Sequence, residues 1–150
     1  MISFNGNPPI HDLLHVGWYM RETDAREVIA SHGEEPVNTL MKSWADSKER
    51  WLFYWNGEPF CAAGVVRIDQ EVGTPWMLAT NGWNDVPKKL LWRVSKYLMT
   101  SWLKYFPILT NYVDVRNDVS VSWLTRLGAT FDEAVPYGHQ QMPFTRFEIR

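Results

Sequence analysis

The side chains that could carry chemistry gather in two stretches of the sequence. The first contains three cations, Lys88, Lys89 and Arg93, at the start of a predicted helix that follows Thr80. Cations and free N–H groups at a helix N-terminus can hold an anionic ligand such as a phosphate. The same cluster is also typical of an ordinary solvated helix surface, and both interpretations stay open.

The second stretch runs from Ile108 to Phe131. Tyr112 and Asp114 lie on a predicted strand there, and a phenol and a carboxylate are residue types that can act as general acid and base. Asn117 follows at the start of a short predicted helix, where its side chain can accept hydrogen bonds from the first turn. Gly128 supplies the left-handed residue that ends this helix. The N-cap role alone is sufficient to explain Asn117.

Several further residues are weaker candidates. Tyr137 and His139 lie in a predicted loop near the C-terminus, and Trp83 lies in a turn where an exposed aromatic ring would suit a ligand or a partner. Glu58 lies beside a predicted hairpin and is another carboxylate with no assigned face. The four histidines show no metal-ligand spacing, so no metal site is predicted.

Length, composition and charge limit the number of domains and the kinds of partner that this chain could have. The chain has 150 residues, 45% of them hydrophobic, which predicts one globular domain, and its formal net charge of −2 argues against a nucleic-acid partner. No run of 18 apolar residues and no signal-peptide pattern occur, so we expect no membrane partner and a cytoplasmic protein. The single cysteine, Cys61, lies in an apolar strand and is expected to be buried.

The remaining elements must position these candidates. Residues 1–12 contain turn signals and a Pro-Pro pair and are predicted as a flexible N-terminal arm, with a single domain over residues 13–150. Hydrophobic periodicity and turn signals predict the other elements. The expected strands cover 13–20, 51–55, 60–68, 74–80, 109–115, 131–135 and 144–149, and the expected helices cover 23–32, 36–47, 87–104 and 118–127.

This order predicts an α+β fold with a mixed, mostly antiparallel sheet. The Asn56-Gly57 pair between two apolar runs indicates a hairpin, because both residues tolerate positive φ. The long helix between Thr80 and Leu109 is long enough to return the chain to the same sheet edge, so the two flanking strands are expected to be parallel neighbours.

The order of elements, together with the spacing of eleven residues from Asn117 to Gly128, resembles the GNAT superfamily of acetyl-CoA-dependent N-acyltransferases. In that family the helix after the Asn closes in Gly-Phe, whereas Ala129 follows the glycine here. The resemblance implies a sheet of six to seven strands, about four helices and one parallel β-α-β crossover. It also implies that acetyl-CoA is the cofactor to test.

The resemblance carries over to a set of cofactor-binding positions, which are Leu78, Ala79, Thr80, Lys88, Lys89, Arg93 and Asn117. Two family features are absent. The family's glycine-rich turn, Gln/Arg-x-x-Gly-x-Gly/Ala, is replaced by a segment with one glycine, the carboxylate Asp85 and the proline Pro87. Leu124 stands where the family's usual tyrosine acid would lie. The catalytic residue is therefore unassigned, with Asp114, Tyr112 and Tyr137 as weak candidates.

A narrower resemblance covers the segment from Trp76 to Ile149. Stretches such as Pro75-Trp76-Met77-Leu78-Ala79-Thr80 and the closing Phe144-Thr145-Arg146-Phe147 look like small tailed-phage proteins, including the internal virion protein A of podoviruses and acetyltransferase-like phage proteins. With its degenerate acyl-CoA motifs, the chain would then act mainly by binding a phage or host protein, in virion assembly or host takeover. It would be located in the host cytoplasm, with possible association with the virion.

The alternative hypothesis is an active acetyl-CoA-dependent N-acetyltransferase acting on an amine of a protein or small molecule. Glu22 and Glu27 are predicted as surface charges of the first helical region. The GNAT resemblance places that region on the acceptor side, so a substrate role for these carboxylates also stays open.

Overall fold

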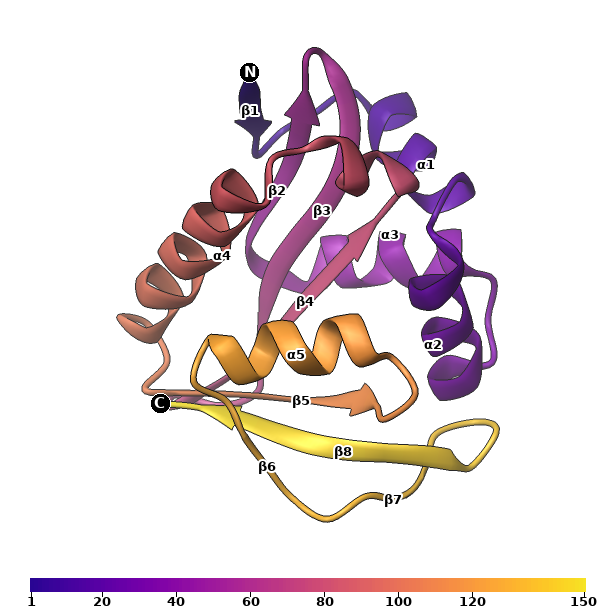
Figure 1. The fold of residues 1–150 in the computed structure, drawn as a ribbon, viewed down its shortest axis with the longest axis vertical. Helices are drawn as coiled ribbons and strands as arrows, with labels where there is room; N and C mark the ends of the chain where they lie inside the picture. Colours follow the sequence, from indigo (N-terminus) through magenta and orange to yellow (C-terminus); the bar gives the residue numbers. More distant parts are fainter.

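A computed structural model describes residues 1–150, and it contains a single eight-stranded sheet with five α-helices (Figure 1). Starting from one edge, the strand order is β1-β2-β3-β4-β5-β8-β6, and β7 pairs with β8. Every pair is antiparallel except β4–β5, which is parallel. The predicted α+β class and the parallel crossover are confirmed, with more strands and helices than expected.

The elements have the following bounds. The strands are β1 Ile2–Asn5, β2 Ser47–Trp55, β3 Glu58–Arg67, β4 Val72–Ala79, β5 Ile108–Asp114, β6 Thr130–Phe131, β7 Val135–Tyr137 and β8 Met142–Ile149. The helices are α1 Ile10–Trp18, α2 Glu22–His32, α3 Pro36–Asp46, α4 Lys88–Leu103 and α5 Asp118–Arg126, with a 3-10 turn η1 over Asn81–Asp85. None of these helices combines the length and hydrophobicity that crossing a bilayer requires.

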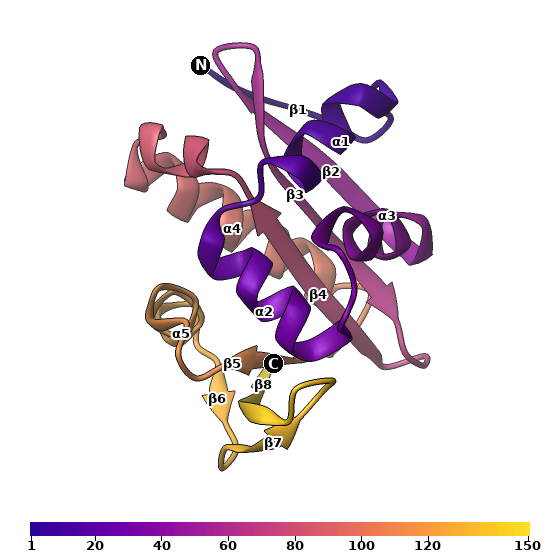
Figure 2. The same cartoon turned by 90° about the vertical axis from the view of Figure 1, so that its right-hand side faces the viewer.

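The helices form two layers around the sheet, and Figure 2 shows α1, α2 and α3 on one face and α4 on the other. The first layer packs Leu13 and Val16 of α1 and Leu40 of α3 against Leu52 and Ala62 of the sheet. The larger core lies under α4 and α5 and includes Trp102, Phe106 and Leu109. The sheet between the two layers is therefore covered on both faces.

Residues 10–18 are helical, so the predicted strand over 13–20 was wrong. Leu13, Val16 and Gly17 are the buried residues of α1, and their spacing of three and four is that of a helix face. Gly17 lies against Val37 of α3, where a Cβ would meet that side chain at 2.7 Å. The weak alternation of apolar and polar residues indicated a strand, but the apolar residues on one buried face of a short helix can give a similar pattern.

Residues 1–12 do not form an unpaired arm. Strand β1 pairs with β2 from Ile2 opposite Trp55 to Asn5 opposite Leu52, and the Asn56 N–H donates to the Met1 carbonyl at 3.0 Å. The edge of β2 offers backbone groups that pair with these residues, which turn signals in the sequence could not show. The Asn56-Gly57 hairpin turn is confirmed, with φ of 48° and 86°.

The parallel contact between β4 and β5 is short. Only Val72 opposite Ile108 and Gly73 opposite Leu109 are paired. Pro75 is the next residue of β4 that faces β5, and it has no N–H to continue the ladder. There the Asn111 side chain, through Nδ2, donates to the Pro75 carbonyl at 2.9 Å. A side chain thus replaces backbone pairing, and the strands separate beyond this point.

Candidate active site

A cleft of about 610 Å³ opens where β4 and β5 separate. Thr74 to Leu78 of β4 and Thr110 to Val113 of β5 all line it. Consecutive strand residues point to opposite faces of a sheet, so a cleft that contacts every one of them crosses the sheet. Residues of α2, α4 and α5 line it, and α2 lies on the opposite face of the sheet from α4 (Figure 2).

The backbone of β4 offers one donor to this cleft. The Ala79 N–H donates to the Asp24 carboxylate at 3.0 Å, and the Ala79 carbonyl accepts from the Arg21 N–H at 2.8 Å. These groups face away from β3, and backbone direction alternates along a strand. Pro75 and Met77 therefore face the same side as Ala79. Because Pro75 has no N–H, Met77 provides the donor that points into the cleft.

The backbone N–H groups of Leu78, Ala79 and Thr80, which the sequence suggested as cofactor contacts, do not point into the cleft. Leu78 lies opposite Ala62, with its backbone groups directed toward β3. The Thr80 N–H donates to the Phe60 carbonyl at 2.9 Å, and the Thr80 hydroxyl accepts from the Gly82 N–H at 3.1 Å. Although Leu78 lines the cleft with its side chain, the backbone donors of Leu78, Ala79 and Thr80 are directed elsewhere.

Glu27 of α2 is the cleft-lining carboxylate without a cationic partner. Its Oε1 accepts from the Asp114 N–H at 3.0 Å, and its Oε2 accepts from Asn117 Nδ2 at 2.9 Å. Burial raises the pKa of Glu27 to about 7, against the effect of these two hydrogen bonds and with a further rise from the charges of Asp24 and Asp114. A half-buried carboxylate with this pKa can accept a proton near neutral pH.

Asn117 performs two tasks with one amide. Its Oδ1 accepts from the Ser120 N–H at 3.3 Å, which confirms the predicted N-cap of α5. Its Nδ2 donates to Glu27, and the side chain is buried. The short turn after β5 therefore orients the carboxylate on α2.

Asp114, a weak catalytic candidate from the sequence, is engaged by its neighbour. Its carboxylate accepts from Arg116 Nε at 2.9 Å and from Arg116 Nη2 at 2.6 Å, and it does not line the cleft. Burial alone would raise the pKa of Asp114, but the hydrogen bonds and charge of Arg116 hold the pKa below its ordinary value. The geometry gives the role of base to Glu27 rather than to Asp114.

Tyr112 and Tyr137, the other two candidates, both line the cleft. Their rings stack with centroids 4.0 Å apart and planes at 12°, and Tyr137 also packs against Phe144 at 5.2 Å. Burial, together with the proximity of Tyr112, raises the pKa of Tyr137. The Tyr137 phenol therefore stays neutral near pH 7 and keeps a proton that can be donated.

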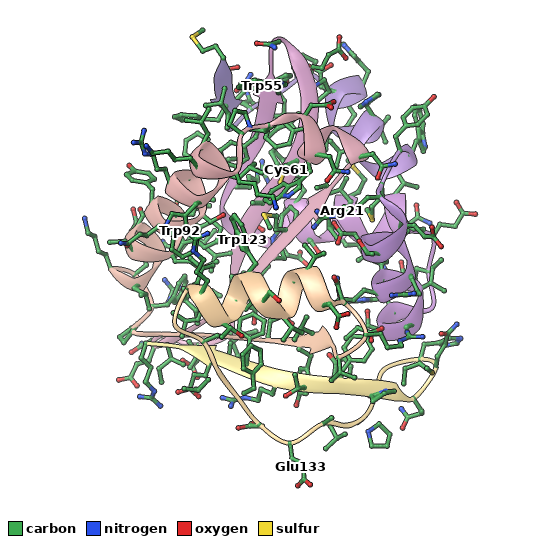
Figure 3. All side chains as sticks on the ribbon, in the orientation of Figure 1. Arg21, Trp55, Cys61, Trp92, Trp123 and Glu133 are labelled. Carbon is green, nitrogen blue, oxygen red and sulfur yellow. The ribbon has the colours of Figure 1, made fainter.

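Asp24 and Arg21 connect α2 to the end of β4. Arg21 Nε donates to Asp24 Oδ2 at 2.8 Å, and that oxygen also accepts from the Ala79 N–H. The guanidinium of Arg21 lies 5.1 Å from the centre of the Trp83 ring. Burial raises the pKa of Asp24 even though Arg21 and the Ala79 N–H lower it. This pair fixes the position of α2 relative to β4, as Figure 3 shows for Arg21 beside β4.

Trp83 and Trp123 line the cleft on the opposite side, and Trp92 packs behind Trp123. The rings of Trp83 and Trp123 meet edge to face at 5.9 Å, and those of Trp92 and Trp123 at 5.6 Å. Trp123 Nε1 donates to the Ser95 hydroxyl at 3.0 Å, and Figure 3 shows Trp92 and Trp123 between α4 and α5. Trp83 is thus a partly buried wall residue that lines the cleft.

The start of α4 is the place where the sequence suggested an anion site. The first-turn N–H groups of Lys88 and Lys89 have no intrahelical partner, as at the start of any helix. The N-cap residue, Pro87, makes no side-chain hydrogen bond to them either. Lys88, Lys89 and Arg93 are exposed and lie outside the cleft lining. The single glycine of the preceding turn, Gly82, has its N–H engaged by Thr80.

Other candidates lie elsewhere. His139 is exposed and packs its ring on Gly33, while its N–H donates to the Ser31 carbonyl at 2.9 Å. Cys61 is buried, and burial raises the pKa of its thiol. Glu58 is exposed at the start of β3. No group of three or more His, Cys, Asp or Glu side chains could hold a metal ion.

The sequence indicated Glu27 only as a surface charge with an open substrate role, and it gave no indication of the Met77 N–H. A signal for Glu27 existed, since Asp24, Glu27, Val28 and Ser31 recur every three or four residues and so share one face of α2. All four line the cleft. No sequence signal identifies Met77, because its direction depends on the separation of β5 from β4.

Comparison with known proteins gives structural relatives without sequence relatives. No sequence-family model and no curated protein sequence matches the chain. An aminoglycoside N(6')-acetyltransferase from Legionella pneumophila superimposes with a TM-score of 0.72 at 14% identity, over 99% of this chain and 91% of that one. A spermidine N-acetyltransferase from Vibrio cholerae, in complex with CoA and spermine, gives 0.70 at 11% identity, over 99% and 94%.

A GNAT-family acetyltransferase from Streptococcus pneumoniae gives a TM-score of 0.65 at 13% identity, over 99% of this chain and 98% of that one. At these identities the likeness shows the fold, and this chain has the GNAT-like fold that its sequence resembles. None of the comparisons supports the resemblance to phage virion proteins.

Proposed function

We propose that this protein is an N-acyltransferase that moves the acetyl group of acetyl-CoA to an amine. The observation that carries the proposal is the cleft through the sheet, with the Glu27 carboxylate on its α2 side and the Met77 N–H on β4. A cleft open to both helical layers can receive a thioester from one face and an amine from the other.

The residues of the cleft and of the start of α4 are compatible with most parts of acetyl-CoA. The walls of the cleft on the α4 and α5 side are largely apolar, which suits the narrow pantetheine arm. The uncapped start of α4 and the exposed Lys88 and Lys89 offer positive potential to the pyrophosphate. Gly82 and Asp85 do not help, since the Gly82 N–H is engaged and Asp85 adds a negative charge. The phosphate contacts are therefore weaker than the fit of the cleft.

Acetyl-CoA supplies an acyl group activated as a thioester. With the thioester bound, Glu27 would accept a proton from the attacking amine, and the N–C bond of the product amide would form as the C–S bond breaks to release a thiolate. The Met77 N–H donates to the carbonyl oxygen, where negative charge develops. Tyr112 and Tyr137 line the cleft, and a phenol there can return a proton to the thiolate, a role that Leu124 cannot perform.

The binding-protein hypothesis from the sequence rests on the missing glycine-rich turn and the missing tyrosine acid. In the structure, Leu124 lines the cleft, and the turn before α4 is the 3-10 segment η1. These two features support weak coenzyme binding, and none of the comparisons supports a phage or host partner. The acyltransferase is therefore the function we propose, and the virion role stays a prediction.

Two measurements on the unmodified protein test the proposal. Thermal unfolding with millimolar acetyl-CoA should raise the Tm by several degrees, because a ligand that binds only the native state stabilises it. ADP at the same concentration is the control for a general anion effect. Thiol release from acetyl-CoA should then depend on an added primary amine. Absence of both the Tm shift and amine-dependent thiol release would contradict the proposal.

A further inference from the structure

The charged groups that line the cleft are mostly paired. Arg21 is bonded to Asp24 at 2.8 Å, and Arg146 is bonded to Asp132 at 3.2 Å and to Glu148 at 2.9 Å. Glu27 alone accepts only neutral donors, the N–H of Asp114 and the amide of Asn117. The cleft therefore offers one uncompensated carboxylate to a cationic acceptor.

The cleft on the α2 side also has an extensive aromatic and aliphatic surface. The stacked rings of Tyr112 and Tyr137 form one wall together with Phe144. Val28, Val66, Ile68, Trp76 and Leu78 extend this apolar surface, and the hydroxyls of Ser31, Thr39, Ser43, Thr74 and Thr110 lie among them. The aromatic and aliphatic part gains by burying a flat or aliphatic group. The hydroxyls are neutral, so they supply no negative charge to a second ammonium.

We propose that the acceptor is a compound with one amine attached to an aromatic or aliphatic body. The amine meets Glu27, and the body packs against Tyr112 and Tyr137. This inference rests on the proposed function and makes it more specific. It separates this chain from the aminoglycoside and spermidine acetyltransferases that share its fold, whose named substrates carry several amines.

A polyamine is disfavoured by electrostatics. Each additional ammonium that enters the cleft loses hydration and needs a carboxylate to compensate. Asp24 is already paired with Arg21 and with the Ala79 N–H, and Asp114 is paired with Arg116. Arg146 likewise occupies Asp132 and Glu148, so a second ammonium finds no free carboxylate to offset its desolvation.

The test compares acceptors on the full-length protein with acetyl-CoA. Phenethylamine and hexylamine are the single amines, and spermidine and kanamycin are the polyamines. We expect kcat/KM for phenethylamine to exceed that for spermidine by at least about tenfold, which corresponds to the loss of one compensated charge. A preference for spermidine or kanamycin would overturn the inference while leaving the acyltransferase itself intact.

Two further readouts make each outcome decisive. If acetyl-CoA raises the Tm and neither single amine releases thiol, the proposed acceptor class is wrong. If acetyl-CoA has no effect on the Tm and no amine reacts, the proposed function fails as well.

An Ile68→Glu variant adds a carboxylate at a cleft residue that is 61% exposed, and it should shift the acceptor preference toward spermidine. The matched control is Ile29→Glu, on an α2 residue that is 41% exposed and outside the cleft lining.

Discussion

The side-chain amide of Asn117 donates to the carboxylate of Glu27 at 2.9 Å, across 90 residues of sequence. The same amide caps α5 through its oxygen. One residue thus couples the start of a helix on one side of the cleft to a carboxylate on the other. This coupling makes the protonation of Glu27 sensitive to a residue whose local role is structural.

Replacing Asn117 should therefore shift a pH profile rather than only reduce stability. Asn117→Ser keeps a good N-cap residue but removes the donor to Glu27. Because the Asn117 hydrogen bond lowers the pKa of Glu27, its loss should move the midpoint of the kcat–pH profile upward. Asn117→Asp should move it further, since a second carboxylate replaces the donor. An unchanged midpoint in both variants would contradict the coupling.

Glu27→Gln should reduce kcat by about 10²- to 10⁴-fold, which is the usual contribution of a positioned base. In the unmodified protein, kcat should rise with pH through about 7, because the ionised carboxylate is the form that accepts a proton. Glu22→Gln is the matched control, since Glu22 is an exposed residue of the same helix. Equal losses in the two variants would argue against Glu27 as base.

Stability should depend on pH through the same carboxyl group. Folding raises the pKa of Glu27 from 4.5 to about 7, so the folded state binds more protons than the unfolded state between these values. The free energy of unfolding should then decrease as pH rises from 4.5 to 7, by at most about 3 kcal/mol.

Urea unfolding at several pH values would measure this slope, and Glu27→Gln should flatten it. Asp24 also has a raised pKa and acts in the same direction, but it is present in both proteins. The difference between the two curves therefore isolates Glu27. Parallel curves over this interval would show that Glu27 has the same pKa in both states.

The donor on β4 can be removed with one substitution. Met77→Pro deletes the N–H that faces the cleft, and it leaves the β3–β4 ladder intact because Pro75 already occupies the equivalent orientation two residues earlier. We expect a loss of about 10²- to 10³-fold in kcat, with the far-UV circular dichroism unchanged. Met77→Ala loses the side chain but keeps the N–H, so it should retain most of the activity.

The cations at the start of α4 should affect coenzyme binding rather than the chemical step. Lys88→Gln with Lys89→Gln should raise KM for acetyl-CoA by about threefold to tenfold, most at low salt, and leave kcat nearly constant. Lys96→Gln, on the same helix and exposed, is the control. Asp85→Asn should act in the opposite direction by removing repulsion. A pure kcat effect in the double variant would contradict this assignment.

Local signals in the sequence determined much of the fold. The Asn56-Gly57 turn, the Asn117 cap and the Gly128 stop depend on the conformational preferences of single residues, and each occurs where the sequence predicts it. The long helix between two strands also predicted their parallel pairing, since a crossover of that length returns the chain to the same edge. These features involve neighbours in sequence, and short-range physics is enough to infer them.

The site itself was decided by tertiary structure. The sequence predicts Glu27 as a surface charge, and only the packing of α2 beside the cleft buries it. Its pKa depends on that burial and on donors from residues 114 and 117. The direction of the Met77 N–H matters only because Pro75 ends the β4–β5 ladder and the two strands separate. Burial, strand separation and hydrogen bonds across 90 residues arise from the packing of distant segments, which no local pattern in the chain encodes.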